Sequence, residues 1–254
     1  MRIVHAVLSW LATIVFLPTF GAVMVLFDAA QRVAYYVFGQ RAQEYVAGAV
    51  QWVLVRTFGI CGTHLAVERD PAVRSWTPYI IVSNHQSMFD IVILGSLLFS
   101  NFPKYISKRS LGSWIPTVSF NLRAGGHVLI DRGDAPQALA AIRELGTRVR
   151  AGRCSAMIFP EGTRARAGAL GAFKPAGTLA LLDEAPETPV LPVAIDESWR
   201  LLRHNYLPVP FGTRVRVWLG APISRVRGED PTALIGRVHD EIDATLTRWR
   251  QPVG

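Results

Sequence analysis

Cysteine is scarce in this chain of 254 residues, which contains only Cys61 and Cys154. Neither lies in a CxxC pair or at metal-ligand spacing, which argues against a disulfide scaffold and a cysteine-based metal site. We interpret both as small buried hydrophobic residues in a reducing compartment. A second interpretation remains open for Cys154, which directly precedes an apolar segment: its thiol could take part in catalysis. The chain also lacks internal repeats and low-complexity tracts, so we do not expect a repeat array.

Charge is absent from the N-terminal stretch between Ile3 and Phe27, which contains no Lys, Arg, Asp or Glu. As a helix it would be about 37 Å long, enough to cross roughly 30 Å of hydrocarbon. The stretch therefore predicts membrane attachment. A cleaved signal peptide is disfavoured, because the apolar run is long, only Arg2 precedes it and no small-x-small site directly follows. A buried core helix remains an alternative, and Pro18 and Gly21 leave kinked, re-entrant and interfacial forms open.

The next segment, residues 32–58, places apolar residues at helical spacing among charged ones and predicts a second, amphipathic helix. Arginines flank the apolar run on both sides, so the positive-inside rule does not decide its orientation. We expect residues 1–60 to form a membrane-associated helical pair and residues 61–254 to form the main globular domain.

Acidic residues are outnumbered, with 27 Lys and Arg against 19 Asp and Glu, for a formal charge of +8. Such a positive surface would attract anionic lipids, acidic substrates that donate a chemical group, or nucleic acid. The basic residues do not form runs interleaved with aromatic residues, which disfavours nucleic acid as a partner.

Beyond Gly62, short apolar runs alternate with turns and helical patterns, which is typical of an α/β protein. We expect a mixed central sheet flanked by helices. One helix should follow an N-cap at Asp134 and end at Gly152, and another should begin at Pro231. The expected strands are residues 64–68, 79–83, 105–108, 127–131, 155–159, 190–195 and 214–219, the last with one wet face.

A histidine and a carboxylate follow the second of these strands, in the sequence Asn84-His85-Gln86-Ser87-Met88-Phe89-Asp90. Histidine can accept a hydroxyl proton near neutral pH if another group sets its tautomer, and Asp90 could be that group. Residues five apart diverge on a regular helix, so the pair requires an irregular link. Ser87-x-x-Asp90 also matches a capping box, which leaves a purely local role for Asp90 open.

A second group of residues, Phe159-Pro160-Glu161-Gly162-Thr163-Arg164, follows the apolar segment 155–159. A glycine lets the backbone approach a ligand closely, and Arg164 offers forked donors suited to phosphate, with Thr163 as a further donor. The alternative is a tight turn with a solvated arginine.

Basic residues also end two other expected strands, Lys108 after residues 105–107 and Arg132 after residues 127–131. Single cations at strand ends are usually solvated. Together, however, Lys108, Arg132, Arg164 and Lys174 could converge on one phosphate beside His85.

Four ordered blocks resemble the glycerolipid acyltransferase family, of the lysophosphatidic acid acyltransferase type, over roughly residues 60–222. HxxxxD alone is a weak signal, but FPEGTR after it at this distance is strong. The blocks are Asn84-His85-x-x-x-x-Asp90, Gly126-x-x-Leu129-Ile130-Asp131-Arg132, Phe159-Pro160-Glu161-Gly162-Thr163-Arg164 and Val190-Leu191-Pro192-Val193-Ala194-Ile195.

The resemblance implies that His85 is the general base, that Asp90 orients it, and that Arg132, Glu161, Gly162 and Arg164 form the acceptor phosphate and glycerol site. From the residues themselves, Thr163 and Lys108 join this substrate-binding set. One departure concerns Lys174, because this chain reads Phe173-Lys174-Pro175-Ala176-Gly177 where the family more often has Phe-Lys-x-Gly.

The implied reaction is direct transfer of a fatty acyl group from acyl-CoA or acyl-ACP to the sn-2 hydroxyl of 1-acyl-sn-glycerol 3-phosphate, without metal or further cofactor. The product would be phosphatidic acid, a phospholipid precursor, made at the inner membrane with the catalytic domain facing the cytoplasm and an anionic membrane surface. Two alternatives remain: another acceptor (a different lysophospholipid, a lyso-ornithine lipid or glycerol 3-phosphate), and a non-catalytic lipid-binding protein in the membrane.

Overall fold

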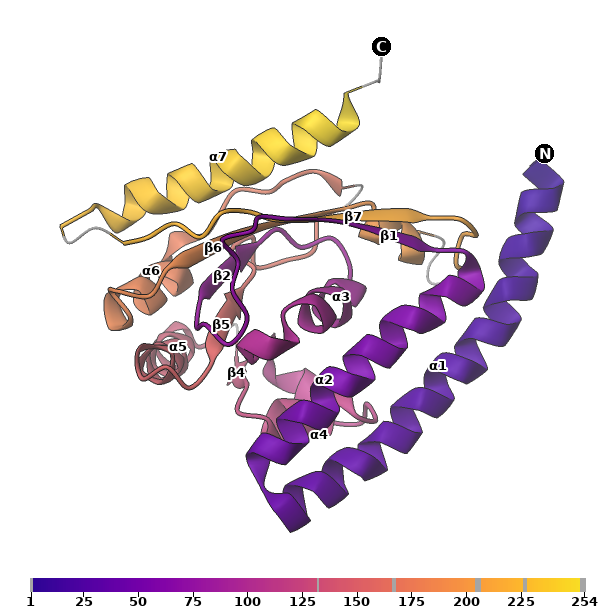
Figure 1. Cartoon of the computed structure of the whole chain (residues 1–254), viewed down its shortest axis with the longest axis horizontal. Coiled ribbons are helices and arrows are strands. Elements are labelled where there is room, and N and C mark those ends of the chain that lie inside the picture. Colours follow the sequence, from indigo (N-terminus) through magenta and orange to yellow (C-terminus); the bar gives the residue numbers. More distant parts are fainter. Residues whose placement is uncertain (1, 132, 166–167, 204–206, 226–227, 252–254) are drawn as a thin grey trace.

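A mixed sheet of seven strands, in the order β1-β7-β6-β2-β5-β3-β4, forms the centre of the protein (Figure 1). The computed structural model describes residues 2–131, 133–165, 168–203, 207–225 and 228–251. The strands are β1 (His64–Arg69), β2 (Ile80–Ser83), β3 (Pro103–Lys108), β4 (Val128–Ile130), β5 (Ser155–Ile158), β6 (Val190–Asp196) and β7 (Arg214–Leu219). All seven lie at the predicted segments, and the expected α/β class is confirmed.

Five neighbouring strands, from β6 through β2, β5 and β3 to β4, run parallel to one another. Strand β7 runs antiparallel to β6, and β1 is parallel to β7. The carboxyl ends of the five parallel strands therefore meet at one edge of the sheet, where open α/β folds place their ligand sites.

Helices cover both faces of the sheet (Figure 1). On one face, Ile80 and Val82 of β2 pack into a buried cluster with residues of α5, α6 and α7. On the other, Ile81 packs with Phe16 of α1 and Leu94 of α3. The helices are α1 (Arg2–Phe38), α2 (Gln40–Thr57), α3 (Phe89–Leu97), α4 (Val118–Ala124), α5 (Ala135–Arg150), α6 (Pro175–Glu184) and α7 (Pro231–Arg250), with short 3-10 helices η1 (Phe58–Cys61), η2 (Phe99–Asn101), η3 (Arg109–Gly112) and η5 (Ser198–Leu202).

Burial along the strands follows from this layering. All four residues of β2 and of β5 are buried because helices cover both faces of these strands, and apart from the terminal Ser83 and Ser155 they are apolar. Strand β7 instead buries alternate residues, Val215, Val217 and Leu219, as predicted for a strand with one wetter face.

Local signals in the sequence set the ends of α5 and α7. The Asp134 carboxylate accepts the backbone N–H of Gln137 at 3.0 Å, and Gly152 adopts a φ of +72° just beyond the helix. Asp230 caps α7 in the same way through the N–H groups of Thr232 and Ala233. Both predicted helices are confirmed, since capping satisfies donors that the first turn leaves unpaired.

The N-terminal region forms two helices as expected, but the predicted boundary between them, between residues 27 and 32, was wrong. Helix α1 continues through Pro18 and Gly21 to Phe38, and Asp28 pairs with Arg32 one turn later at 2.8 Å, which supports the helix where a break was expected. The chain turns at Gly39, whose φ of +85° favours glycine, and α2 then begins.

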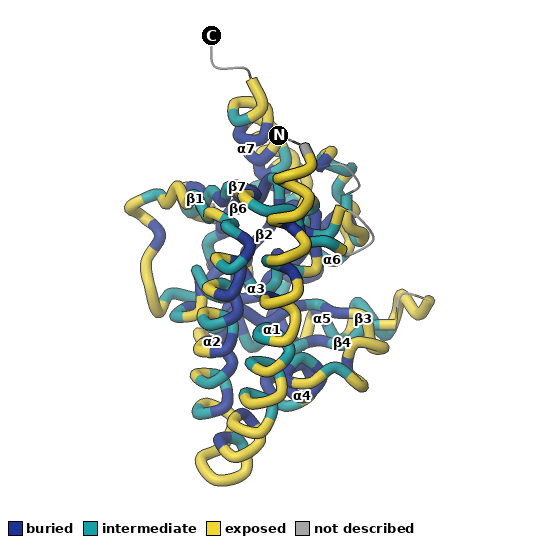
Figure 2. The backbone as a smooth tube through the Cα atoms, turned by 90° about the vertical axis from the view of Figure 1, so that its right-hand side faces the viewer, coloured by how far each residue is buried: buried dark blue, intermediate teal, exposed yellow. Residues whose placement is uncertain are grey.

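Helix α1 turns its polar side chains toward the protein and its apolar ones outward. Thr13 accepts the N–H of Val209 at 2.9 Å, and Ser9 accepts that of Phe211 at 3.0 Å. Only 11% of its most apolar 18-residue window is buried, which excludes the buried core helix, and an exposed stripe runs along it (Figure 2). Among the described residues it is the single helix long and apolar enough to cross a membrane. This pattern, the reverse of a soluble helix, indicates association with a membrane.

Candidate active site

His85 and Asp90 are joined by a hydrogen bond at the carboxyl edge of the sheet. His85 lies in the loop after β2, whereas Asp90 lies in the first turn of α3. The distance from Nδ1 of His85 to Oδ2 of Asp90 is 2.8 Å. The loop supplies the irregular link that the spacing demanded, since the two residues do not belong to one regular helix. The Asp90 side chain is fully buried, whereas that of His85 is 15% exposed.

The same carboxylate oxygen of Asp90 also accepts the backbone N–H groups of Gln86 at 2.6 Å and Ser87 at 2.8 Å. The capping interpretation and the pairing interpretation therefore both hold for Asp90. Because an ionised carboxylate only accepts hydrogen bonds, Nδ1 of His85 carries the proton and Nε2 is left with the lone pair that can accept another.

Phe159, the residue after β5, stacks on the imidazole ring of His85. The ring centroids are 4.2 Å apart and the planes are inclined by 22°. The aromatic face fixes the plane of the imidazole, while the hydrogen bond to Asp90 fixes its rotation in that plane. His85 is thus held from two directions.

Glu161 joins two loops of the site. One carboxylate oxygen accepts the backbone N–H of His85 at 2.7 Å and the other accepts that of Gly171 at 2.9 Å. Burial raises the pKa of Glu161, although the two N–H groups act in the opposite direction. The family resemblance implies an acceptor-binding role for Glu161, and in the structure its buried side chain joins the two loops of the site.

Residues 162–165 lie beside His85. The N–H of Ala165 donates to the carbonyl oxygen of His85 at 2.7 Å, which places exposed Thr163 and Arg164 next to the imidazole loop. Gly162 has a φ of +70°, and a Cβ there would lie 3.3 Å from Nζ of Lys174. The turn therefore needs glycine and brings the Lys174 ammonium over its backbone.

The predicted cluster of cations is placed in part. Lys108 is exposed at the carboxyl end of β3, on the same edge of the sheet as His85, while Arg132 lies outside the described residues. Within the described part of the chain, Lys108, Arg164 and Lys174 make no ion pair with an acidic side chain. These three cations therefore remain available to an anionic ligand. The described residues contain no group of three His, Cys, Asp or Glu side chains that could hold a metal ion.

Cys154 lies at the opposite edge of the sheet, immediately before β5 begins, and is buried. Burial raises the pKa of its thiol, which disfavours the nucleophilic thiolate. Cys154 lies at the start of β5, whereas Phe159 and the His85 site lie at its other end. This separation argues against the thiol mechanism that the sequence left open.

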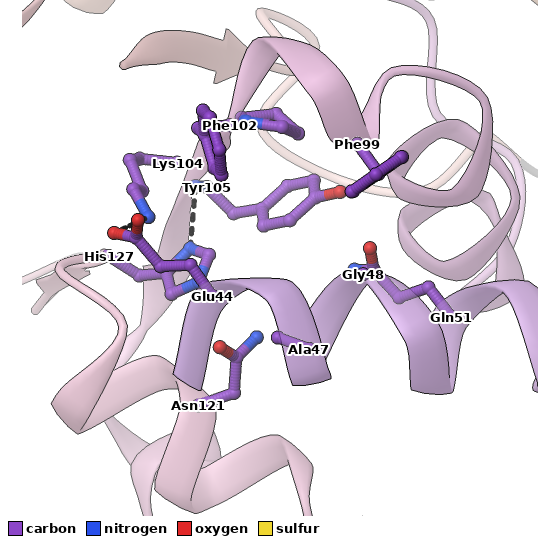
Figure 3. A pocket seen from close by; sticks show the side chains of 11 residues that line it. Glu44, Ala47, Gly48, Gln51, Phe99, Phe102, Lys104, Tyr105, Asn121 and His127 are labelled. Carbon is purple, nitrogen blue, oxygen red and sulfur yellow. Dashed lines mark hydrogen bonds and ion pairs between the residues drawn. The ribbon is translucent and has the colours of Figure 1, made fainter. Parts of the chain in front are cut away.

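A small cavity of about 30 Å³ between α2 and β3 also lies away from the carboxyl edge (Figure 3). The Lys104 ammonium lies in the polar wall of this cavity, where it donates to Glu44 at 2.7 Å and to the Gly125 carbonyl oxygen at 2.7 Å. Burial, with the nearby charges of Lys104 and Arg148, holds the pKa of His127 well below its usual value. The polar groups here satisfy one another, so we interpret the cavity as part of the packing of α2 on the sheet.

Three functional candidates escaped the sequence analysis: Gln86, Asp196 and Arg250. Asp196 ends the fully buried strand β6, which is a detectable signal because acidic residues are rarely buried without a partner. Nothing local distinguishes Arg250, at the end of α7, from the other arginines of that helix.

The Acyltransferase family model matches residues 64–196. The 1-acyl-sn-glycerol-3-phosphate acyltransferase of Escherichia coli K12 is 27% identical over 173 residues, covering 68% of this chain and 69% of the relative. The enzyme of that name from Salmonella typhimurium is 30% identical over 177 residues, covering 68% and 69%. The human 1-acyl-sn-glycerol-3-phosphate acyltransferase beta is 30% identical over 180 residues, covering 70% of this chain and 63% of the relative.

The crystal structure of the 1-acyl-sn-glycerophosphate (LPA) acyltransferase PlsC from Thermotoga maritima has the same fold. Its TM-score is 0.75 at 20% sequence identity, with both chains covered completely. The family match contains the His85–Asp90 pair, the Phe159–Arg164 turn and strand β6. The chain therefore belongs to the acyltransferase family and is an enzyme of that class.

Proposed function

We propose that this chain transfers a fatty acyl group from a thioester donor to the sn-2 hydroxyl of 1-acyl-sn-glycerol 3-phosphate, giving phosphatidic acid for phospholipid synthesis. The relatives named above carry this activity in their names. The observation that carries the proposal is the 2.8 Å hydrogen bond between His85 and Asp90 at the carboxyl edge of the sheet.

His85 acts as the general base. Asp90 holds the proton of Nδ1, so Nε2 removes the proton of the acceptor hydroxyl. The alkoxide oxygen forms a bond to the thioester carbonyl carbon, the C–S bond then breaks, and the thiolate leaves with the proton returned by the imidazolium. No covalent acyl-enzyme forms. Such a base contributes roughly 10² to 10⁴ in rate, and positioning of the acceptor supplies the other large part.

Arg164 binds the acceptor phosphate, with Lys108 and Arg132 contributing charge and the backbone of Gly162 and Thr163 approaching the ligand. The exposed position of Arg164, next to the His85 loop, supports this assignment. Glu161 contributes by holding the backbone of His85 in place. The donor is acyl-CoA or acyl-ACP.

The outward apolar side of α1 attaches the enzyme to the inner membrane, with the catalytic domain on the cytoplasmic side. The formal charge of +8 adds attraction to anionic lipid headgroups. Protease treatment of intact spheroplasts tests the orientation, because the catalytic domain should survive until the membrane is permeabilised.

Replacing the base tests the mechanism most directly. We expect His85→Ala to lower kcat by about 10² to 10⁴, because the lost group is a proton acceptor and not a part of the core. The matched control is His64→Ala, which removes an exposed imidazole on the edge strand β1. Thiol release from the donor is the measurement, with circular dichroism as the check on folding. Unchanged turnover in His85→Ala would refute the assignment.

A panel of acceptors separates the proposed substrate from its alternatives. Lysophosphatidic acid, a lysophospholipid with a larger headgroup, a lyso-ornithine lipid and glycerol 3-phosphate are each offered with acyl-CoA and with acyl-ACP. We expect the highest kcat/KM with lysophosphatidic acid. Preference for another acceptor would replace the substrate but keep the chemistry, whereas no thiol release with any pair would favour the non-catalytic lipid-binding protein.

A further inference from the structure

The two residues that flank His85 are both anchored on the end of β6. The side chain of Asn84 accepts the N–H of Ile195 at 2.8 Å and donates to its carbonyl oxygen at 2.9 Å. The side chain of Gln86 donates to Oδ1 of Asp196 at 3.0 Å. The loop that carries the imidazole is therefore set by the last two residues of the neighbouring strand.

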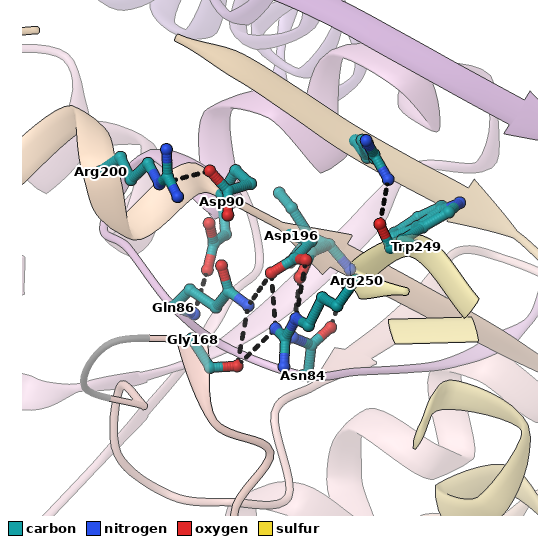
Figure 4. A network of polar contacts seen from close by, with 11 residues as sticks. Asn84, Gln86, Asp90, Gly168, Asp196, Arg200, Trp249 and Arg250 are labelled. Carbon is teal, nitrogen blue, oxygen red and sulfur yellow. Dashed lines mark hydrogen bonds and ion pairs between the residues drawn. The ribbon is translucent and has the colours of Figure 1, made fainter. Parts of the chain in front are cut away.

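Gln86 links this anchor to the Asp90 carboxylate. Its backbone N–H donates to the oxygen of Asp90 that also bonds to His85, while its side chain reaches Asp196 (Figure 4). The side-chain bond to Asp196 restrains Gln86, and any change in the backbone of Gln86 would move the N–H that orients Asp90. The position of Asp196 thus bears on the geometry of the catalytic pair.

Asp196 is itself held by Arg250, the last residue of α7. The guanidinium donates from Nε to Oδ2 at 2.9 Å and from Nη2 to Oδ1 at 2.6 Å, a bidentate pair. The Asp196 side chain is 3% exposed and that of Arg250 is 40% exposed. Burial alone would raise the pKa of Asp196, but the hydrogen bonds from Arg250 and Gln86 outweigh it and hold the pKa below its usual value.

The same guanidinium reaches the loop that follows the Phe159–Arg164 turn. Nη2 of Arg250 donates to the carbonyl oxygen of Gly168 at 2.6 Å, and Nε2 of Gln86 approaches that oxygen at 3.4 Å. Gly168 has a φ of +78°, and a Cβ there would lie 3.2 Å from Nη2 of Arg250. One arginine therefore joins both loops of the site to the C-terminal helix.

We propose that Arg250 is a positioning residue for acyl transfer, which holds Asp196 and Gln86 so that Asp90 and His85 keep their productive geometry. Arg250 contacts Asp196 and the Gly168 carbonyl, and we assign it no direct part in binding the substrate. Its contribution passes through two hydrogen bonds to the carboxylate and through the Gly168 carbonyl, and it makes α7 part of the catalytic apparatus. The inference rests on the proposed function only in that acyl transfer must be measurable.

The test compares Arg250→Ala with Arg248→Ala in the full-length protein. Arg248 lies in the same last turn of α7 and pairs with Glu68 at 2.8 Å on the surface, so it is a matched control. We expect Arg250→Ala to lower kcat by roughly 10- to 100-fold with the acceptor KM within about 2-fold, because a displaced base affects the chemical step and not binding. Arg248→Ala should keep the wild-type kcat.

Rescue distinguishes positioning from bulk stability. Methylguanidinium should restore kcat of Arg250→Ala saturably, because the half-exposed site admits it, and should leave Arg248→Ala unchanged. Arg250→Lys should retain an intermediate kcat, since an ammonium cannot form the bidentate pair. If Arg250→Ala fails to fold, Arg250→Lys keeps a cation beside the buried Asp196 carboxylate and provides the variant for the kcat comparison, with Arg248→Lys as its matched control.

A wild-type kcat in folded Arg250→Ala, even with a lower melting temperature, would overturn the proposal. So would a folded variant of low kcat that neither methylguanidinium nor lysine improves. These outcomes are read against wild-type activity in the same assay. Absence of thiol release by the wild type with every acceptor would instead refute the proposed function, so the two failures are distinguishable.

Discussion

At the scale of single residues, one carboxylate oxygen organises the site. Oδ2 of Asp90 accepts from His85 and from two backbone N–H groups, so the orientation of the imidazole and the start of α3 depend on the same atom. The HxxxxD spacing therefore has a physical reason: four intervening residues make the loop that lets a helical carboxylate turn back to the histidine.

Arg164→Ala should mainly weaken binding of the acceptor. We expect the KM for lysophosphatidic acid to rise by about 10-fold or more while the KM for the thioester donor stays within about 2-fold, because an arginine bound to phosphate contributes roughly 1.5 to 3 kcal/mol. Steady-state kinetics with each substrate varied in turn provide the measurement. Equal effects with monoacylglycerol, which lacks the phosphate, would indicate a structural arginine.

Cys154→Ser should retain acyl transfer. The thiol is buried at the edge of the sheet away from His85 and its pKa is raised by burial, so we do not expect it to supply a nucleophile. We expect kcat within about 3-fold of wild type, with some loss of stability from the buried hydroxyl. An inactive variant with a wild-type circular dichroism spectrum would instead support a catalytic thiol.

At the scale of elements, α2 packs closely against η2 because it carries Gly48. A Cβ at this position would lie 2.5 Å from Cδ2 of Phe99, whereas a Cβ at Gly21 in α1 would meet nothing within 4 Å. Helix α2 is thus the packed member of the N-terminal pair, and α1 is the member that faces outward.

Gly48→Ala and Gly21→Ala should have opposite effects. The first introduces a methyl group into a filled contact and should destabilise the protein by about 1 to 3 kcal/mol. The second should be neutral or stabilising by up to about 1 kcal/mol, because alanine favours helix more than glycine does. Thermal unfolding of both variants in the same detergent provides the comparison. A stabilising Gly48→Ala would show that α2 packs less tightly than described.

At the scale of the whole molecule, folding buries ionisable groups that charge when the chain unfolds. His127 lies under α2, where its Nδ1 accepts the N–H of Tyr105 at 3.0 Å and its ring stacks on that of Tyr105. Burial, with the charges of Lys104 and Arg148, lowers its pKa, so the folded protein keeps this imidazole neutral.

This burial predicts acid sensitivity. Below about pH 6.5 the unfolded chain binds a proton at His127 that the folded chain excludes, so the free energy of unfolding falls as the pH decreases. His127→Asn keeps an acceptor near the Nδ1 position but does not titrate, and should flatten this dependence. Denaturant unfolding of wild type and variant between about pH 5 and 8 measures it. Equal slopes would contradict the assignment.

Much of the fold could be predicted because its signals are local. The strands 155–158 and 214–219 were visible as apolar or alternating runs, and Asp134 and Gly152 marked the ends of α5. The boundary between α1 and α2 could not be placed in the same way, because Pro18 interrupts the pattern without ending the helix, while Gly39 ends it through its left-handed backbone.

For the site, the amino-acid sequence alone identified the residues that lie close together along the chain: the His85 to Asp90 loop and the Phe159 to Arg164 turn. It could not show that Glu161 binds the backbone of His85, or that Arg250 reaches Asp196, since these contacts join segments brought together only when β2, β5 and β6 pair. Composition and spacing determined which chemistry the chain carries. The pairing of distant strands decided how that chemistry is held, because hydrogen bonds of a few ångströms depend on three-dimensional packing and leave no periodic trace in the sequence.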